Sequence, residues 1–304
     1  MNRTGALAVK TGRASKTAEH NALFRALEAR RPDEDRVVED LLAEAFLPWR
    51  FKLVTVPARW RVWRDTVTRF IDRRWPGVRP TVIARTHLID ATIGDIVDTT
   101  PQVVILGAGL DTRAWRLPDL HGMLVFEVDH PDTQRRKQAL LRRRHLDGAR
   151  VRFIPTDFNL GRLATAMADA GYDRTLPTLF LWEGTTNYLT AEAVDATLRW
   201  CARAAAGSQL LFTYINKDVL IDPGRYVGAD QVFSTLRSAG EPMTFGLAPA
   251  DLADYLAERG LHLVSDVGAA SFRQRAYGAA GETIHGHEFY RVAHAQIAAA
   301  DCAA

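Results

Sequence analysis

The sequence has few cysteines and no long apolar run, and each absence excludes a class of protein. Two of its 304 residues are cysteines, Cys201 and Cys302. Two are too few for a disulfide framework or a cysteine-rich metal cluster, so we expect a reducing compartment and no metal. No stretch of about 18 apolar residues occurs, and Met1–Lys16 lacks the apolar segment of a signal peptide. We therefore predict a cytoplasmic protein with no membrane partner.

A strong excess of one charge is also missing. The net charge is +3, and basic runs such as 135–137 and 142–144 fall on predicted helices. Such runs are typical of solvated helix faces, so we expect no nucleic-acid partner. A content of 47% hydrophobic and 25% charged residues is ordinary for a globular protein with a large core. The sequence does not indicate the oligomeric state.

Strand signals are absent from residues 17–98, which divides the chain into two parts. Apolar periodicity predicts helices there, separated by prolines, over 18–29, 37–46, 58–74 and 81–97. We expect an N-terminal helical extension over 1–98 and a core over 99–304, most simply within one structural domain. The aromatic residues Trp60, Trp63, Phe70 and Trp75 are expected to pack the extension on the core, although some could instead form the wall of a pocket.

From residue 102 onward, short apolar strands alternate with helices. Strands are predicted over 102–106, 123–128, 151–155, 178–182 and 208–214, with helices over 131–144, 160–169 and 191–204. This alternation is typical of a Rossmann-like, doubly wound α/β fold with a parallel sheet covered on both faces. A polar segment over 216–246, with one short helix near 230–238, is expected to form a lid. A helix over 249–259 and strands over 261–267 and 287–293 complete the prediction.

Two strand ends carry the strongest functional signal. Val103–Arg113 contains Gly107 and Gly109 directly after an apolar strand, and Asp129 ends the next strand, 22 residues beyond Gly107. Glycines permit a tight turn close to a ligand, and an acidic group at this spacing can accept hydrogen bonds from ribose hydroxyls. Thr112 stands where a dinucleotide fingerprint has its third glycine. The pattern therefore favours a nucleoside without phosphates over NAD, and an NAD-dependent oxidoreductase is the weaker alternative.

These motifs, together with Leu-Trp-Glu-Gly-Thr-Thr-Asn-Tyr-Leu-Thr at 181–190, resemble the leucine carboxyl methyltransferase-like family. The closer resemblance is to its bacterial branch of small-molecule O-methyltransferases, the tetracenomycin polyketide methyltransferase type. It implies a class I methyltransferase with S-adenosyl-L-methionine as cofactor and a seven-stranded sheet whose last strand is antiparallel. The acceptor implied is an oxygen, carboxylate or hydroxyl, of a small secondary metabolite. The alternatives are N- or C-methylation of such a metabolite, or binding of an adenosyl ligand without catalysis.

The candidate cofactor-binding residues follow predicted strands, where ligands of open parallel sheets bind. The resemblance places the methionine portion over Gly107, Ala108, Gly109 and Asp111, although Asp111 could equally cap the following turn. Glu127 and Asp129 share one strand face, and we favour Asp129 for the ribose. The remaining candidates are Asp157 and Phe158 for the adenine, Arg85 for the cofactor's carboxylate and Glu183 for its amino group. Asp157 could alternatively be a helix N-cap, and Arg85 a surface residue or a salt-bridge partner.

Catalytic residues are less well defined by the sequence. Methyl transfer from a sulfonium requires chiefly alignment and exclusion of water, and a hydroxyl acceptor also benefits from a general base. Tyr188 and Tyr214 are weak candidates, as are His130 and His285, and a structural role is favoured for each. We expect the acceptor pocket to be formed by the extension before residue 98 and the segment 216–246.

Overall fold

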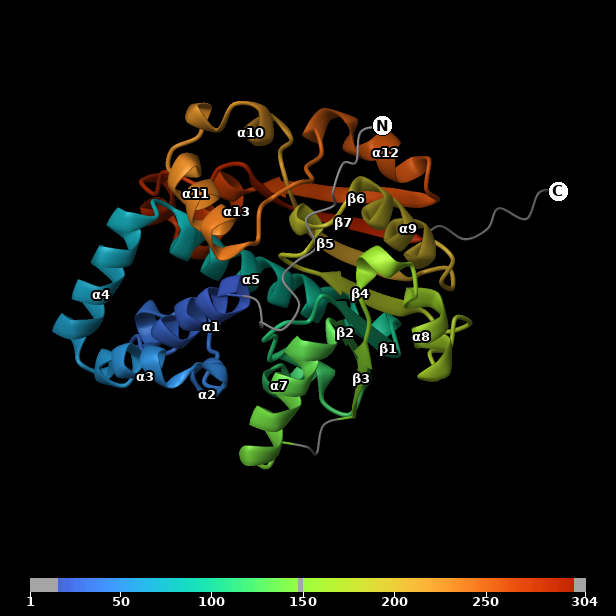
Figure 1. Ribbon diagram of the computed structural model, residues 1–304, viewed down its shortest axis with the longest axis horizontal. Helices are drawn as coiled ribbons and strands as arrows, with labels where there is room; N and C mark the ends of the chain where they lie inside the picture. The colour runs from blue at the N-terminus through green and yellow to red at the C-terminus, as the bar shows by residue number, and fades with distance from the viewer. Residues whose placement is uncertain (1–15, 147–149, 298–304) are drawn as a thin grey trace.

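The computed structural model describes residues 16–146 and 150–297, and its centre is a seven-stranded sheet (Figure 1). The predictions made for 1–15 and for Cys302 lie outside these ranges. The strands follow the order β3-β2-β1-β4-β5-β7-β6, and β7 is antiparallel to both of its neighbours while the other pairs are parallel. The predicted Rossmann-like fold with an antiparallel last strand is confirmed. The strands are β1 (Gln102–Leu106), β2 (Leu124–Asp129), β3 (Val151–Pro155), β4 (Thr178–Trp182), β5 (Gln209–Ile215), β6 (Leu261–Gly268) and β7 (Tyr290–Ile297).

Helices cover both faces of the sheet, which explains the continuous apolar strands. Every residue of β1, β4 and β5 is buried. Side chains from α8 (Leu163–Asp169), α9 (Ala191–Cys201) and α12 (Leu252–Ala257) form one core cluster with the strands. On the opposite face, α5 (Val78–Ile96) and α13 (Ala269–Tyr277) form a second one. Three other helices that follow β1 in the chain are α6 (Arg113–Arg116), α7 (Pro131–Arg143) and α14 (Ala279–Glu282).

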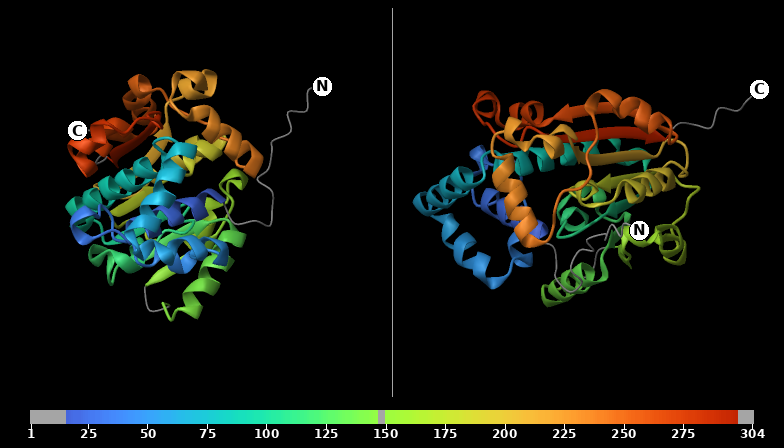
Figure 2. Two further views of the ribbon diagram at one scale, coloured as in Figure 1. Left: turned by 90° about the vertical axis from the view of Figure 1, so that its left-hand side faces the viewer. Right: turned by 45° about the horizontal axis from the view of Figure 1, so that its top comes forward.

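The N-terminal extension is helical, as predicted, but its helices have different bounds. It contains α1 (Lys16–Glu28), α2 (Ala43–Phe46), α3 (Trp49–Thr55) and α4 (Arg61–Arg74), which lie at one end of the sheet in Figure 1 and in the right-hand view of Figure 2. The helix predicted over 37–46 is wrong except for its last turn. Asp40 is fully buried there, accepts a hydrogen bond from the Ala43 N–H and pairs with Arg25, so this segment is fixed by side-chain contacts rather than by helical periodicity.

The segment 216–246 lies against the extension. It contains α10 (Asp218–Ile221) and α11 (Ala229–Ala239). Beyond α11, the carboxylate of Glu241 accepts hydrogen bonds from the backbone N–H of Lys16 (3.0 Å) and of Thr17 (3.2 Å) at the start of α1. This carboxylate therefore caps α1 and joins two segments that are far apart in the sequence.

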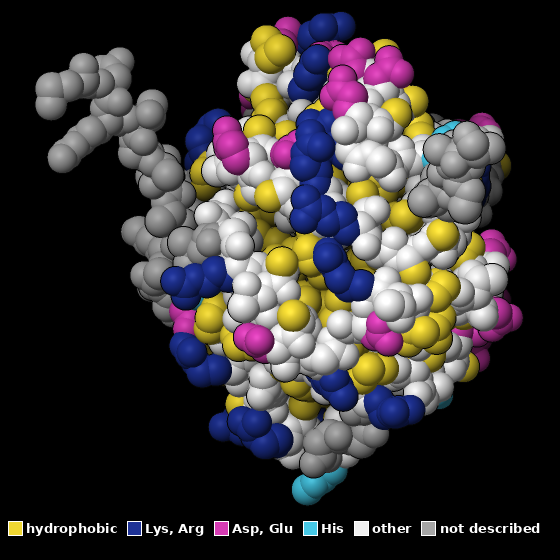
Figure 3. All heavy atoms as spheres, turned by 90° about the vertical axis from the view of Figure 1, so that its right-hand side faces the viewer, with side chains coloured by type: hydrophobic (Ala, Val, Ile, Leu, Met, Phe, Trp, Pro, Cys, Tyr) yellow, Lys and Arg dark blue, Asp and Glu magenta, His cyan; other side chains and the backbone are white. Residues whose placement is uncertain are grey.

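The end of the sheet departs further from prediction. The final strand begins at Tyr290 rather than 287, because residues 285–288 form a tight loop in which His287 has a positive φ. Among the described helices, none is long and apolar enough to cross a membrane. On the face at the right of Figure 1, Lys and Arg side chains form a narrow row with Asp and Glu side chains nearby (Figure 3), so charges of both signs share this face.

Candidate active site

The glycine turn after β1 lies close to two other strand ends. Gly107 has φ +68° and Gly109 φ +49°, a conformation that favours glycine. A Cβ at Gly107 would overlap the side chain of Thr185, which follows β4. The N–H of Gly109 donates to the carboxylate of Asp129 at the end of β2. The two glycines therefore let the turn pack closely between the ends of β2 and β4. Ala108, which lies between them, is buried.

Asp129 and Glu127 have different environments although they share a face of β2. Asp129 is half-buried, and its second oxygen accepts from the His130 N–H at 2.5 Å. Glu127 is fully buried, and both of its oxygens accept from Nζ of Lys137 on α7, at 2.7 and 2.8 Å. The ion pair fills the hydrogen-bonding side of the Glu127 carboxylate. Its pairing with Lys137 supports the preference for Asp129 over Glu127 as the ribose ligand, which stays a prediction.

Asp157 and Phe158 follow β3 at the same edge of the sheet. Asp157 accepts a hydrogen bond from the Asn159 N–H at 2.9 Å and caps a short 3₁₀ turn, the structural alternative considered for it. The ring of Phe158 stacks on that of Trp182, with centroids 6.4 Å apart. Asp157 is half-buried. Capping leaves oxygen lone pairs available, so a contact with adenine stays a prediction.

Arg85, Glu183 and Asp111 meet in a buried network built around Arg113. The guanidinium of Arg113 is 3% exposed and contacts Glu183 at 2.8 Å, Asp90 at 2.7 Å and Asp111 at 2.5 Å. Nε of Arg85 donates to the other oxygen of Glu183 at 2.7 Å. The sequence prediction missed Arg113. One signal in the sequence could have pointed to Arg113. Several acidic residues follow neighbouring strand ends, and buried carboxylates require a buried cation nearby.

The network keeps its acids ionised. Burial by itself would raise the pKa of Glu183, but the charges of Arg113 and Arg85 outweigh it and lower the pKa to about 2. Burial likewise opposes ionisation of Asp111, and Arg113 nevertheless holds its pKa well below the usual range. Asp111 also accepts from the Arg113 N–H at 2.7 Å, so it caps the turn as the alternative reading expected. The carboxyl ends of β1 and β4 therefore carry fixed charges of both signs.

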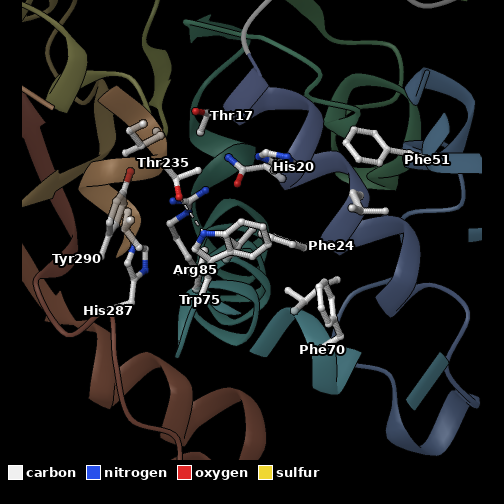
Figure 4. Close-up of a pocket in the computed structure, with 18 of the residues that line it drawn as sticks. Thr17, His20, Phe24, Phe51, Phe70, Trp75, Arg85, Thr235, His287 and Tyr290 are labelled. Atoms are coloured by element: carbon white, nitrogen blue, oxygen red, sulfur yellow. Dashed lines mark hydrogen bonds between the residues drawn. The ribbon is translucent and has the colours of Figure 1, made fainter. Parts of the chain in front are cut away.

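An apolar cavity of about 490 Å³ opens beside this network (Figure 4). The extension and α11 form its walls, and Nε1 of Trp75 donates to Oγ1 of Thr235 on α11 at 3.1 Å across them. Arg85, Gly184 and Tyr188 also line it. Trp63, Phe70 and Trp75 line it too, whereas Trp60 is outside it and 59% exposed. Three of the four aromatics of the extension thus line the cavity, which agrees with the alternative that some of them form the wall of a pocket. Other apolar lining residues are Phe24, Phe51, Val67, Val232 and Met243.

Only one of the two candidate tyrosines lies at the cavity. Tyr188 lines it, but Tyr214 is fully buried and its hydroxyl donates to Asp266 at 2.9 Å, so the catalytic prediction for Tyr214 is wrong. Neither His130 nor His285 lines the cavity. Two other histidines do, His20 and His287, and the sequence carried no signal for either because no motif surrounds them.

The residues at the strand ends fit an adenosyl cofactor. The turn at Gly107 admits no Cβ, and the half-buried Asp129 carboxylate lies against it. A buried arginine, Arg85, lines the cavity and is hydrogen-bonded to Glu183, which directly follows β4. A nucleoside recognised by an acid, next to a carboxylate recognised by an arginine, requires this set of groups.

Comparisons with known proteins identify the family of this chain. The family model of leucine carboxyl methyltransferase matches residues 18–202. A putative S-adenosyl-L-methionine-dependent methyltransferase of Mycolicibacterium smegmatis is 32% identical over 243 residues, covering 78% of this chain and 69% of the relative. One from Bacillus subtilis is 30% identical over 216 residues, covering 68% and 71%.

Solved structures share the fold at low sequence identity. A DUF574-family protein of Streptomyces avermitilis has a TM-score of 0.56 at 19% identity, over 77% of this chain and 90% of that one. A putative methyltransferase of Thermobifida fusca has a TM-score of 0.55 at 17% identity, over 78% and 89%. From the matched family model and the two relatives, we conclude that this chain belongs to the leucine carboxyl methyltransferase family of S-adenosyl-L-methionine-dependent methyltransferases.

Proposed function

We propose that this enzyme transfers the methyl group to an oxygen of a small-molecule acceptor with a largely apolar body, such as a secondary metabolite. The observation that carries the proposal is the cavity of about 490 Å³, which lies within the range of roughly 300–1,000 Å³ that small-molecule sites occupy. Its walls are mostly aromatic and aliphatic, and Arg85 and Gly184 also line it. The resemblance to bacterial small-molecule O-methyltransferases supports the same acceptor class.

The chain's residues would orient the two reactants. In the proposed arrangement Asp129 holds the ribose, Asp157 and Phe158 the adenine, and Arg85 the carboxylate of the cofactor. The turn Gly107–Gly109, Asp111 and Glu183 form the floor beside the methionine portion. The cofactor supplies a methyl group that its sulfonium already activates, so alignment and exclusion of water remain for the protein.

Contacts between 216–246 and the extension would help to keep water out of the cavity. Glu241 caps α1, and Trp75 is hydrogen-bonded to Thr235 on α11. Both contacts hold 216–246 against the helices that form the opposite cavity wall. We therefore propose that 216–246 acts as a lid over the acceptor.

A cavity-filling variant tests the proposal. Val67 lines the cavity from α4, and Val62 on the same helix is 79% exposed outside it. The wild-type enzyme is incubated with S-adenosylmethionine and a library of phenols, aromatic acids and amines, and formation of S-adenosylhomocysteine is measured. We expect Val67→Trp to abolish transfer while leaving calorimetric binding of S-adenosylhomocysteine unchanged. Val62→Trp is the matched control and should preserve both.

The product identifies the atom that is methylated. An O-methyl signal in the proton NMR spectrum of the product supports the proposal, and an N- or C-methyl signal contradicts it. Binding of S-adenosylhomocysteine with no transfer to any library member would favour a non-catalytic adenosyl-binding protein. Full activity of Val67→Trp would show that the acceptor does not enter this cavity.

A further inference from the structure

His287 has a backbone conformation that few residues other than glycine adopt. Its φ is +63°, and the loop around it is braced on both sides. Nη1 of the buried Arg273 donates to the Gly286 carbonyl at 2.5 Å, and Glu288 accepts from the Gly286 N–H at 2.6 Å. The His287 N–H donates to the Val227 carbonyl at 3.3 Å. Uncommon backbone conformations held by such contacts are concentrated at functional sites.

The imidazole of His287 lines the cavity with hydrogen-bonding capacity that the protein does not use. The side chain stacks on Tyr290, with centroids 5.1 Å apart and planes 25° apart, on the same side of the cavity as Arg85 (Figure 4). The residue is 4% exposed, and its Nδ1 is buried without a hydrogen-bond partner in the part of the chain that the structure describes. A buried polar atom without a partner is costly, and a bound ligand is one way to satisfy it.

The charges around His287 keep its ring neutral. Burial lowers the pKa of His287, and the positive charges of Arg85 and Arg273 lower it further, to about 3. A neutral imidazole presents one N–H donor and one bare nitrogen acceptor. A hydroxyl group can donate to that bare nitrogen, whereas an ionised carboxylate cannot. The ring is therefore suited to an acceptor that carries a hydroxyl.

We propose that His287 binds and orients the hydroxyl group of the methyl acceptor. This inference rests on the proposed function and narrows its acceptor from oxygen compounds in general to alcohols or phenols. The hydroxyl donates to the bare imidazole nitrogen, which aims an oxygen lone pair at the methyl group. As the oxygen–carbon bond forms, the carbon–sulfur bond breaks and its electrons stay on sulfur. The hydroxyl proton passes to the bare imidazole nitrogen, and it is released to solvent when the product leaves, because Arg85 and Arg273 disfavour a lasting imidazolium.

Two substitutions separate hydrogen bonding from packing. His287→Phe keeps an aromatic ring against Tyr290 but removes both nitrogens. His287→Asn keeps a side-chain acceptor and a residue type that tolerates positive φ. His262, exposed on β6, provides the matched control His262→Phe. Each protein is saturated with S-adenosylhomocysteine and titrated calorimetrically with 2-naphthol or with naphthalene, which has the same apolar body without the hydroxyl.

We expect His287→Phe to weaken 2-naphthol binding at least tenfold and to change naphthalene binding less than twofold. His287→Asn should recover part of the 2-naphthol affinity, and His262→Phe should match the wild type. Equal losses for both ligands, or no loss for 2-naphthol, would overturn the role of His287. If the wild type binds S-adenosylhomocysteine but neither probe, the apolar acceptor site itself fails, and the proposed function fails with it.

Discussion

Replacing Arg113 by methionine should destabilise the protein strongly while leaving its shape nearly intact. The guanidinium is 3% exposed and pairs with Asp90, Asp111 and Glu183. Removing one partner from a buried ion pair typically costs about 3–5 kcal/mol, because the remaining charge is left without compensation. Here three carboxylates lose a partner, while Arg85 still neutralises Glu183 in part. We therefore expect a loss of about 4 kcal/mol, a large share of the roughly 5–15 kcal/mol that stabilises a typical domain.

Urea unfolding followed by tryptophan fluorescence measures this loss, with Arg61→Met as the control. Arg61 is 86% exposed on α4, and its replacement should cost less than about 0.5 kcal/mol. A double-mutant cycle with Asp111→Asn tests the reason. Neutralising Asp111 should be harmful in the wild type but should restore roughly 1–3 kcal/mol when Arg113 is absent. A loss below about 1 kcal/mol for Arg113→Met, or additive effects in the cycle, would refute the account of a charge-balanced network.

Three further outcomes are expected. Asp129→Ala should weaken S-adenosylhomocysteine at least tenfold by calorimetry, about 1.4 kcal/mol, and an unchanged affinity would remove the ribose assignment. Gly107→Ala should lower the thermal midpoint more than Gly207→Ala, since both have positive φ but only Gly107 would overlap Thr185; equal losses would argue against this close approach. The pKa of His287 is about 3 in the folded protein and 6.5 in its ordinary state. As the pH falls, the unfolded chain therefore takes up this proton before the folded one does. The free energy of unfolding should drop by about 2 kcal/mol from pH 7 to 5 for this reason. Denaturant titrations at both pH values should show that His287→Phe loses less stability on acidification than the wild type. Equal losses in the two proteins would contradict the low pKa of His287.

The sequence by itself determined the sheet and which residues follow its strand ends. Strands buried on both faces are continuous apolar runs, so β1 and β4 were predicted at their observed bounds. The glycine turn and Asp129 follow strand ends directly, and chain connectivity places such residues together in any doubly wound sheet. Local order was also misleading in places. The segment 37–46 has helical periodicity, yet the buried contacts of Asp40 with Arg25 and Ala43 leave only its last turn helical.

The sequence indicated that the extension and 216–246 would form a pocket, but tertiary structure alone decided which of their residues line the cavity and how the charges of the site are arranged. Phe24, Val67 and Val232 come from three distant parts of the chain and meet only because the extension and α11 pack against each other. The ring of His287 is neutral because folding buries it near Arg85, about 200 positions earlier in the sequence. A sequence pattern shows the spacing of apolar residues within one helix or strand and the residues that follow its ends. Burial, ion pairing and cavity shape depend on which surfaces of separate elements come into contact, and that is settled by packing.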